Sequence, residues 1–241
     1  MVTSVGNNSV QPSAASYSYT SDQLLAGPLQ IEVDTVTITG AAALKRGTVL
    51  GRVTLGAVTS AAKSGGNTGN GTCVLDVTTP KIAGAVAGVY TLRCTVAGAN
   101  AATFRLADPS GRVLGDYAFN GSGANVLIAN QIKAVITDGS TDFVVGDGFD
   151  ITIANSAASV PAIYKKAVKT AFDGSAVPCR VLIDDVDATL ADKTGSAYRQ
   201  AELNFNRLIY DASFSATDIR VAFRDTSLFI HVPAATNTDP T

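Results

Sequence analysis

The sequence predicts a mainly β protein in which one β domain is inserted into the chain of another. Composition is the first reason: the 241 residues are rich in Gly, Ala, Thr, Val and Ser and only 16% are charged, which favours short strands and tight turns over long helices. The second reason is a regular series of short alternating segments in the middle of the chain. The third is a pair of small-residue stretches, 56–72 and 154–159, that bracket this series.

Two strands are expected in the first flank of the chain, the part that precedes the small-residue stretch 56–72. A folded pattern begins at Gln23, and apolar residues alternate with polar ones over residues 31–39, with a break near Thr35 that indicates a bulge. A second strand is expected over residues 48–55. The stretch 56–72 that follows is rich in Gly, Ser and Asn, a composition that predicts a linker.

Eight short strands are expected in the middle of the chain. Turn signals separate them, among them the segments 108–111 (DPSG) and 120–123 (NGSG). Strands at this spacing are typical of an antiparallel β-sandwich. The expected strands are 73–78, 90–96, 104–107, 113–119, 126–128, 134–137, 143–145 and 149–153.

The second flank predicts more strands and one short helix. The expected strands are 161–168, 181–183, 197–205 and 228–230. Ser215 followed by Asp218 is typical of a helix start, and apolar residues at helical spacing predict a helix over residues 217–224. Neither flank is large enough to be a domain alone, whereas together they amount to about 105 residues, an ordinary domain size.

The chain is therefore divided into an arm, a split core domain, an inserted domain and a tail. The boundaries are 1–21 for a flexible N-terminal arm, 22–60 and 158–233 for the discontinuous core domain, 65–155 for the inserted β-sandwich and 234–241 for the tail. The arm has no charged side chain, and Tyr17 and Tyr19 stand two residues apart, so both rings would lie on one face of a strand. Either the arm is a floppy terminus, or it becomes ordered by adding a strand to the sheet of a partner.

The net charge limits the classes of partner that the protein could bind. A net charge of −2 and a pI near 5.3 argue against nucleic acid or an anionic membrane as partner, because both need a dense cationic surface. The one local cluster of cations, Lys165, Lys166 and Lys169, is interpreted as a solvated face.

No apolar run is long enough to span a membrane, and residues 1–21 lack the features of a secretory signal. A protein made in a reducing cytosol fits best.

The three cysteines, Cys73, Cys94 and Cys179, predict neither a metal site nor a disulfide framework, because they are odd in number and lack the spacing of metal ligands. Cys73 and Cys94 fall on two expected strands of the same segment and could be neighbours. A small buried apolar side chain is the simpler interpretation of each.

No catalytic, metal or cofactor site is expected, so the protein is predicted not to be an enzyme. The one histidine, His231, lies at the end of an expected strand with nothing that would make it a base, and no nucleophile-elbow, phosphate-loop or dinucleotide motif is present. Two acidic groups remain as candidates, namely Asp184, Asp185 and Asp187, and Asp138, Asp142, Asp147 and Asp150. Asp beside Gly is ordinary turn chemistry, and neither group has the glutamate that an EF-hand loop needs.

Several blocks of the two flanks follow one another in an order that is known from one family. They are residues 44–51 (LKRGTVLG), 173–175 (DGS), 177–178 (VP), 181–188 (VLIDDVDA), 201–206 (AELNFN) and the short helix before 228–230 (LFI). In this succession the flanks resemble the head decoration, or capsid cement, proteins of tailed bacteriophages, the family typified by the lambda decoration protein. Residues 90–95 (YTLRCT) and 141–147 (TDFVVGD) are similar to small β domains inserted in phage virion proteins. Typical members of the family lack such an insert.

The resemblance implies a small core, β-tulip or barrel-like with one short helix, that is split by the inserted sandwich. It implies a homotrimer that binds the outer surface of a phage head at three-fold positions and stabilises the shell against internal DNA pressure. The partner is then the major capsid protein, and the protein is part of the virion after synthesis in the bacterial host cytoplasm. The arm would contact the capsid through Tyr17, Tyr19, Leu24 and Leu25, and the inserted domain would point outward.

The alternative is a carbohydrate- or host-cell-binding module, with the inserted domain as the active part and a host-surface molecule as its ligand. Such a module would need exposed aromatic rings on which a sugar can stack. The aromatic residues available in the insert are Tyr90, Phe104, Tyr117, Phe119, Phe143 and Phe149, and most of them fall at core-like positions of the alternating pattern.

Overall fold

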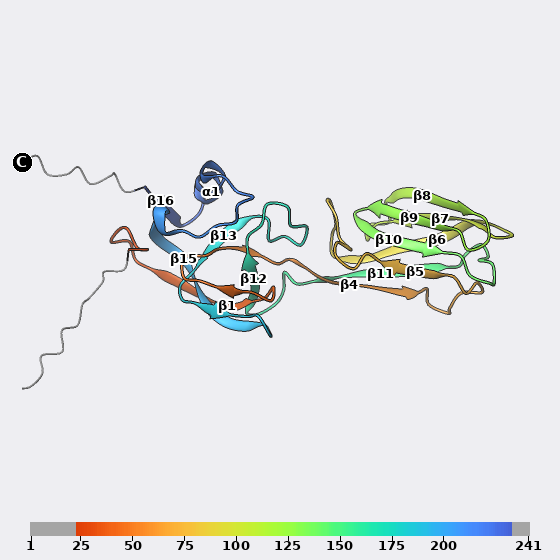
Figure 1. Cartoon of the computed structure of the whole chain (residues 1–241), viewed down its shortest axis with the longest axis horizontal. Coiled ribbons are helices and arrows are strands. Elements are labelled where there is room, and N and C mark those ends of the chain that lie inside the picture. The colour runs from red at the N-terminus through yellow and green to blue at the C-terminus, as the bar shows by residue number, and fades with distance from the viewer. Residues whose placement is uncertain (1–22, 233–241) are drawn as a thin grey trace, which may run out of the picture.

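The computed structural model describes residues 23–232, and within them the chain is mainly β, as predicted (Figure 1). The strands are β1 (Glu32–Ile38), β2 (Ala43–Leu44), β3 (Val49–Arg52), β4 (Leu55–Ala62), β5 (Thr72–Leu75), β6 (Gly88–Gly98), β7 (Ala101–Ala107), β8 (Val113–Asn120), β9 (Asn125–Asn130), β10 (Ile132–Thr137), β11 (Gly148–Asn155), β12 (Ala162–Lys166), β13 (Pro178–Leu182), β14 (Val186–Asp187), β15 (Lys193–Asn204) and β16 (Leu228–His231). The helical elements are the α-helix α1 (Ala216–Phe223) and the short 3-10 helix η1 (Phe205–Arg207).

Within the described residues, every pairing of the labelled strands joins members of one of two groups. The first group contains β1 to β3 and β12 to β16, and we call residues 23–53 and 162–232 the barrel unit. The second group contains β4 to β11, and we call residues 55–155 the two-sheet unit. In Figure 1 the two units lie end to end along the longest axis, and the chain crosses between them before β4 and after β11.

Five strands of the barrel unit form a closed ring. β1 pairs with β12, β12 with β3, β3 with β13, β13 with β15, and β15 returns to β1. The β1–β12 pairing is parallel and the other four are antiparallel. Closure satisfies the backbone groups that an open sheet would leave unpaired at its edges. The prediction of a barrel-like core is confirmed.

At the end of β13 both faces of the ring are covered, which explains the adjacent apolar residues Val181 and Leu182. Val181 lies in a cluster with Ile219 and Phe223 of α1, whereas its neighbour Leu182 lies in a second cluster with Val36 of β1. Successive side chains of a strand point to opposite faces, so where a strand is covered on both sides consecutive residues are apolar. The strand predicted over residues 181–183 is confirmed for Val181 and Leu182, whereas Ile183 follows β13 and is partly buried.

The helix α1 begins where the sequence predicts. The Asp218 carboxylate accepts the N–H of Ser215 at 2.9 Å, and the Ser215 hydroxyl accepts the N–H of Asp218 at 3.1 Å, which makes a reciprocal capping box. Ile219 and Phe223 lie four residues apart and form the buried face of the helix. This face packs α1 against β13 and β16, so the helix covers one outer face of the barrel.

The two-sheet unit has one core between two antiparallel sheets. One sheet has the strand order β4-β11-β6-β7-β8 and the other has the order β5-β10-β9. Alternate residues of both sheets point into a common apolar cluster, whose members all belong to this unit. Within it, the rings of Phe104 and Phe143 meet edge to face with centroids 5.0 Å apart.

The interpretation of residues 56–72 as a linker is wrong for the first half of that stretch. Residues 55–62 form the strand β4, which pairs with β11 from Ala62 opposite Phe149 back to Leu55 opposite Asn155. Strand pairing uses backbone groups only, so a run of small residues is able to form an edge strand although its composition is typical of a linker. The predicted end of the first core segment at residue 60 therefore falls within β4, and the crossing from one unit to the other lies near Thr54.

The strand predicted over residues 143–145 is also wrong. These residues form a loop, and the N–H of Val144 donates to the carboxylate of Asp147 at 3.0 Å. The same carboxylate accepts the N–H groups of Thr68 and Gly69, each at 2.9 Å. A buried aspartate thus takes the place of a neighbouring strand as the acceptor, which alternation of apolar residues cannot reveal.

The cysteines are free, and none forms a disulfide bond. Cys94 is buried in the core of the two-sheet unit, and Cys73 packs against the same cluster. Cys179 packs against a core cluster of the barrel unit. The interpretation of the cysteines as small apolar side chains is confirmed, and burial raises the pKa of each thiol.

Candidate interaction surface

The first described residues of the chain form a short strand along the last part of β15. Leu25 forms an antiparallel bridge with Leu203, and the N–H of Asn204 donates to the carbonyl of Leu24 at 2.8 Å. The Asn204 side chain donates to the carbonyl of Gln23 at 3.0 Å. The N-terminal end of the described chain is therefore fixed to β15 by backbone pairing.

A close approach at Gly27 continues this attachment. A Cβ at Gly27 would lie 1.6 Å from the Oε2 atom of Glu202, so a larger residue there would require the Glu202 carboxylate to move. The same Glu202 carboxylate accepts the N–H of Leu29 at 3.2 Å, and its Oε1 atom lies 3.5 Å from Nε2 of His231. Glu202 thus joins the start of the described chain to its end.

The end of the described chain lies on the other side of β15. β16 pairs with β15 in parallel, with His231 opposite Asn204 and Phe229 opposite Glu202. Phe229 is 50% exposed and Val232 is 47% exposed. Both ends of the described chain are thus neighbours of Asn204, at the end of the barrel unit that faces away from the two-sheet unit (Figure 1).

The four residues predicted to make the arm contact differ in their position. Leu24 is only 4% exposed and belongs to the core cluster with Leu203 and Ile219, so in this conformation its side chain contacts its own chain. Leu25 is partly buried against the same cluster. Tyr17 and Tyr19 lie outside the described residues. The sequence predicts no role for the exposed apolar side chains of Phe229 and Val232, because Phe229 is an ordinary member of a short strand pattern and Val232 follows just after it.

The acidic groups singled out from the sequence have structural partners. Asp185 accepts the Lys45 ammonium at 2.7 Å and the N–H of Arg46 at 2.8 Å, and the lysine hydrogen bond lowers the pKa of Asp185. Asp187 accepts the hydroxyl and the N–H of Thr189 in a local turn. Asp184, which is 79% exposed, lies 4.0 Å from Arg46.

In the two-sheet unit, aspartates fix loops and strands rather than meet one another. Asp150 pairs with Arg93 at 2.5 Å, and Asp142 accepts the N–H of Asn100 at 2.9 Å. Asp147, which is 2% exposed, joins three backbone N–H groups as described above. Burial acts to raise its pKa, but these N–H groups lower the pKa further, so the net shift is downward. Asp138 is buried, and its Oδ2 atom has no hydrogen-bond partner.

The lysine cluster is neutralised by ion pairs. Lys165 pairs with Asp173 at 2.6 Å. The other two pairs are Lys166 with Asp211 at 3.1 Å and Lys169 with Asp218 at 3.0 Å. Three ammonium groups that each have a carboxylate partner do not form the free cationic surface that a polyanion needs.

The aromatic rings of the two-sheet unit lie inside its core. Tyr90 and Phe104 are fully buried, and Phe119, Phe143 and Phe149 are at most 6% exposed. Tyr117 packs partly buried against the same cluster. These rings are not available to stack on a sugar from solution. They therefore do not provide the exposed aromatic surface that a carbohydrate-binding module would need.

The described residues contain no group of three or more His, Cys, Asp or Glu side chains that could hold a metal ion. Over the same residues 23–232, the helices are too short and too polar to cross a membrane.

Comparison with known proteins identifies one family. The family model described as "Bacteriophage lambda head decoration protein D" matches residues 16–230. No curated protein matches. A crystal structure of FlgL from Xanthomonas campestris matches with 22% identity and a TM-score of 0.29, over 44% of this chain and 33% of that chain. The present chain thus spans about a third of FlgL, and a likeness this weak supports no conclusion about fold or function.

Proposed function

The chain belongs to the family of the bacteriophage lambda head decoration protein D, and from this membership we propose that it binds the outer surface of the capsid at three-fold positions as a homotrimer. Membership makes it a head decoration protein that associates with the capsid of the virion. The proposal adds the position, the oligomer and the role, which is to stabilise the shell against the pressure of the packaged DNA.

The observation that best supports the proposal is the position of the chain ends. At both ends of the described range 23–232, the chain pairs with β15 at one end of the barrel unit, and the two-sheet unit lies at the opposite end (Figure 1). An arm that precedes Gln23 would therefore leave the barrel on the side away from the two-sheet unit. If this arm binds the capsid, the two-sheet unit points away from the shell.

The exposed side chains near the chain ends suit a protein surface. Phe229 on β16 and Val232 directly after it are about half exposed, and β16 is an edge strand that has neither a proline nor a lysine to protect it from pairing. We propose that these two residues and Leu25 join Tyr17 and Tyr19 in the contact. Three such contacts on one trimer would turn a weak single contact into firm attachment through high effective concentration.

We also propose that the two-sheet unit is an inserted domain that the capsid contact does not need. Its core contains residues of that unit alone. The N–H of Ser156 donates to the carbonyl of Thr54 at 2.9 Å, so the two ends of the insert are adjacent and a short turn could join them.

The test compares three forms of the protein on heads that lack it: the full chain, a form without residues 1–21, and a form in which a Gly-Ser turn joins Thr54 to Ser156. We expect loss of the arm to weaken binding at least about 100-fold, because three contacts are lost together, while circular dichroism shows an intact fold. The form without the insert should bind like the full chain. Co-sedimentation measures binding, and cryo-electron microscopy locates the bound protein.

Each part of the proposal has its own contrary outcome. Binding that survives removal of residues 1–21 would contradict the arm contact. Density away from the three-fold positions, or a stoichiometry that does not fit a trimer, would contradict the proposed seat. A form without residues 55–155 that does not fold would contradict the insertion.

A further inference from the structure

The two crossings between the barrel unit and the two-sheet unit form a bonded neck. We use this name for residues 52–56 and 155–157, which include the start of β4 and the end of β11. The two segments are joined by the hydrogen bond from Ser156 to Thr54, and the Arg52 guanidinium donates to the carbonyl of Ala157 at 2.5 Å. The crossings are therefore a short two-stranded ribbon and do not behave as two separate linkers.

The barrel unit grips the neck through one turn. The main-chain carbonyl of Asp173 accepts the N–H groups of both Thr54 at 2.8 Å and Leu55 at 3.0 Å. The Asp173 carboxylate in turn accepts the Lys165 ammonium at 2.6 Å and the Ser175 hydroxyl at 2.6 Å. Burial acts to raise the pKa of this carboxyl, but these bonds lower it below its usual range. The turn is thus fixed to the barrel while it holds the neck.

Two glycines permit this close packing. Gly174 has a φ of +95°, and a Cβ there would lie 2.1 Å from the Oγ1 atom of Thr54. A Cβ at Gly51 would lie 1.9 Å from the carbonyl oxygen of Ser175. Any other residue at these positions would push the turn and the neck apart.

The two-sheet unit grips the neck from its own side through Lys81. The Lys81 ammonium donates to the carbonyls of Leu55 at 2.9 Å and Gly56 at 2.5 Å. Burial lowers the pKa of Lys81, and the charge of Asp173 across the neck acts in the opposite direction. Lys81 and Asp173 belong to different units, so this charge interaction crosses the neck.

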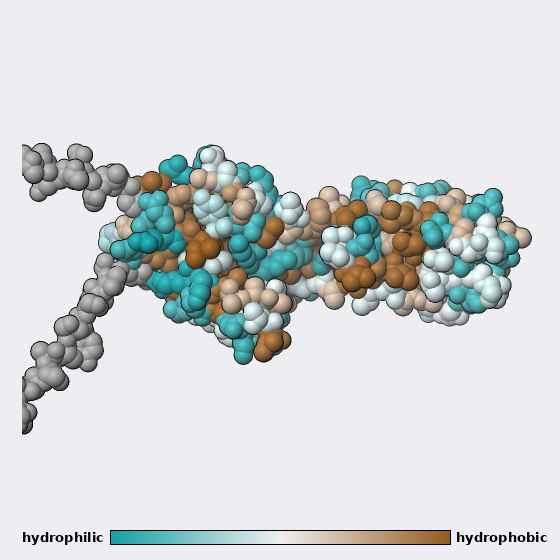
Figure 2. Space-filling view, in the orientation of Figure 1, coloured by the Kyte–Doolittle hydropathy of each residue, from teal (hydrophilic) through white to brown (hydrophobic). Residues whose placement is uncertain are grey.

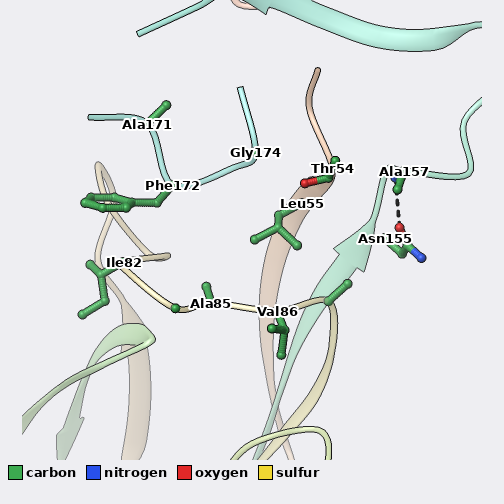
Figure 3. Close-up of a pocket in the computed structure, with 12 residues that line it drawn as sticks. Thr54, Leu55, Ile82, Ala85, Val86, Asn155, Ala157, Ala171, Phe172 and Gly174 are labelled. Atoms are coloured by element: carbon green, nitrogen blue, oxygen red, sulfur yellow. Dashed lines mark hydrogen bonds between the residues drawn. The ribbon is translucent and has the colours of Figure 1, made fainter. Parts of the chain in front are cut away.

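Beside the neck, the units face each other across an open cleft instead of packing together. The cleft has a volume of about 450 Å³ and is lined by Phe172 of the barrel unit and by Ile82 and Val86 of the two-sheet unit (Figure 3). Phe172 is 43% exposed and Val86 is 47% exposed. Figure 2 shows hydrophobic surface gathered at the neck and on the adjoining half of the two-sheet unit. Along this cleft the side chains of the two units leave space between them, so the hydrogen bonds at the neck are the contacts from which we argue their relative orientation.

We propose that the turn 173–175 and Lys81 form a two-sided clamp that fixes the orientation of the two-sheet unit on the barrel unit. The clamp acts on consecutive residues of one strand, because Asp173 takes the N–H groups of Thr54 and Leu55 while Lys81 takes the carbonyls of Leu55 and Gly56. Asp173 and Lys81 are positioning residues. The two-sheet unit is consequently presented at a set angle, and this inference does not depend on what the protein binds.

The test measures orientation and neck opening in the full chain with Lys81→Met and, as matched control, Lys63→Met. The control is apt because the Lys63 ammonium also donates to a main-chain carbonyl, that of Gly66, at 2.6 Å, but far from the neck in the loop after β4. Residual dipolar couplings report whether the two units share one alignment tensor. Hydrogen exchange reports the opening of the amides of Thr54 and Leu55.

In the wild type and in Lys63→Met, one alignment tensor should fit both units. In Lys81→Met, the tensors should separate and the two neck amides should exchange at least about tenfold faster, because the hydrogen bonds to the Leu55 and Gly56 carbonyls are both lost and a single charge-assisted hydrogen bond already corresponds to about a factor of ten. Melting of each unit should stay close to that of the control. Independent tensors in the wild type, or an unchanged tensor and unchanged exchange in Lys81→Met, would overturn the proposal.

Discussion

The barrel unit is assembled from segments far apart in the chain, whereas most strands of the two-sheet unit pair with their neighbours in sequence. β1 pairs with β15, so that Val36 lies opposite Gly195, and β12 lies between β1 and β3. In the two-sheet unit, β6, β7 and β8 pair in succession, as do β9 and β10. The barrel therefore depends on contacts that form only when the long segments between the paired strands have been positioned.

This difference explains how an insert of this size is tolerated. Closing a flexible loop of about 100 residues would cost several kcal/mol of chain entropy, whereas a loop of a few residues costs much less. The folded two-sheet unit keeps Thr54 and Ser156 within hydrogen-bond distance, so to the barrel it is equivalent to a short turn. A local, self-contained fold is thus the kind of insert that a fold with long-range pairing is able to accept.

The largest expected effect tests whether the two units have separate cores. Phe104 is fully buried and contacts the rings of Phe119, Phe143 and Phe149. Phe104→Ala should destabilise the two-sheet unit by about 4 kcal/mol, because it removes buried area and leaves a cavity. Hydrogen exchange resolved by residue should show the loss in β6 to β11 and leave the slow amides of β13 and β15 nearly unchanged. An equal loss of protection in both units would mean that they unfold as one.

A barrel substitution sharpens the same comparison from the other side. Leu24→Ala removes a side chain that is 4% exposed from the cluster beneath α1, and should cost the barrel unit about 3 kcal/mol. Urea denaturation monitored by hydrogen exchange measures this loss, with the two-sheet unit as internal reference. The control is Leu25→Ala, which should cost about 1 kcal/mol, because Leu25 is only partly buried. If Leu24→Ala leaves stability unchanged but abolishes binding to capsids, then Leu24 acts in the capsid contact and not in the barrel core.

Much of the fold could be predicted from residue patterns. Alternation located most strands of the two-sheet unit, and the pair Ser215 and Asp218 located the start of α1, because both signals are local. The strand β4 was missed because its pairing with β11 depends on backbone groups and its side chains are small. The loop at Val144 was read as a strand because the acceptor of its N–H is Asp147, a residue whose role depends on the fold around it.

The candidate surface was predictable only in part. The family resemblance predicts a contact by the N-terminal segment, and Leu25 lies where this segment pairs with β15. Phe229 and Val232 become noticeable only when their exposure is known. The clamp on the neck was not predictable from spacing, because Lys81, Asp173 and Thr54 come from three distant parts of the chain and converge only through long-range pairing.

The smallest expected effect concerns the helix that covers the barrel. Ser215→Ala removes the cap of α1 and should cost the barrel unit about 1 kcal/mol, with no effect on the two-sheet unit. The effect depends on pH through Asp218, whose pKa is lowered to about 2 by the N–H of Ser215, by Lys169 and by the Ser215 hydroxyl. A carboxyl with a lowered pKa in the folded state stabilises above its unfolded pKa of about 3.9, and this stabilisation is lost as the pH falls through about 2. The stability difference between wild type and Ser215→Ala should therefore be larger at pH 6 than at pH 2 in urea titrations. A difference that stays constant over this range would show that the hydroxyl caps the helix without the help of the Asp218 charge.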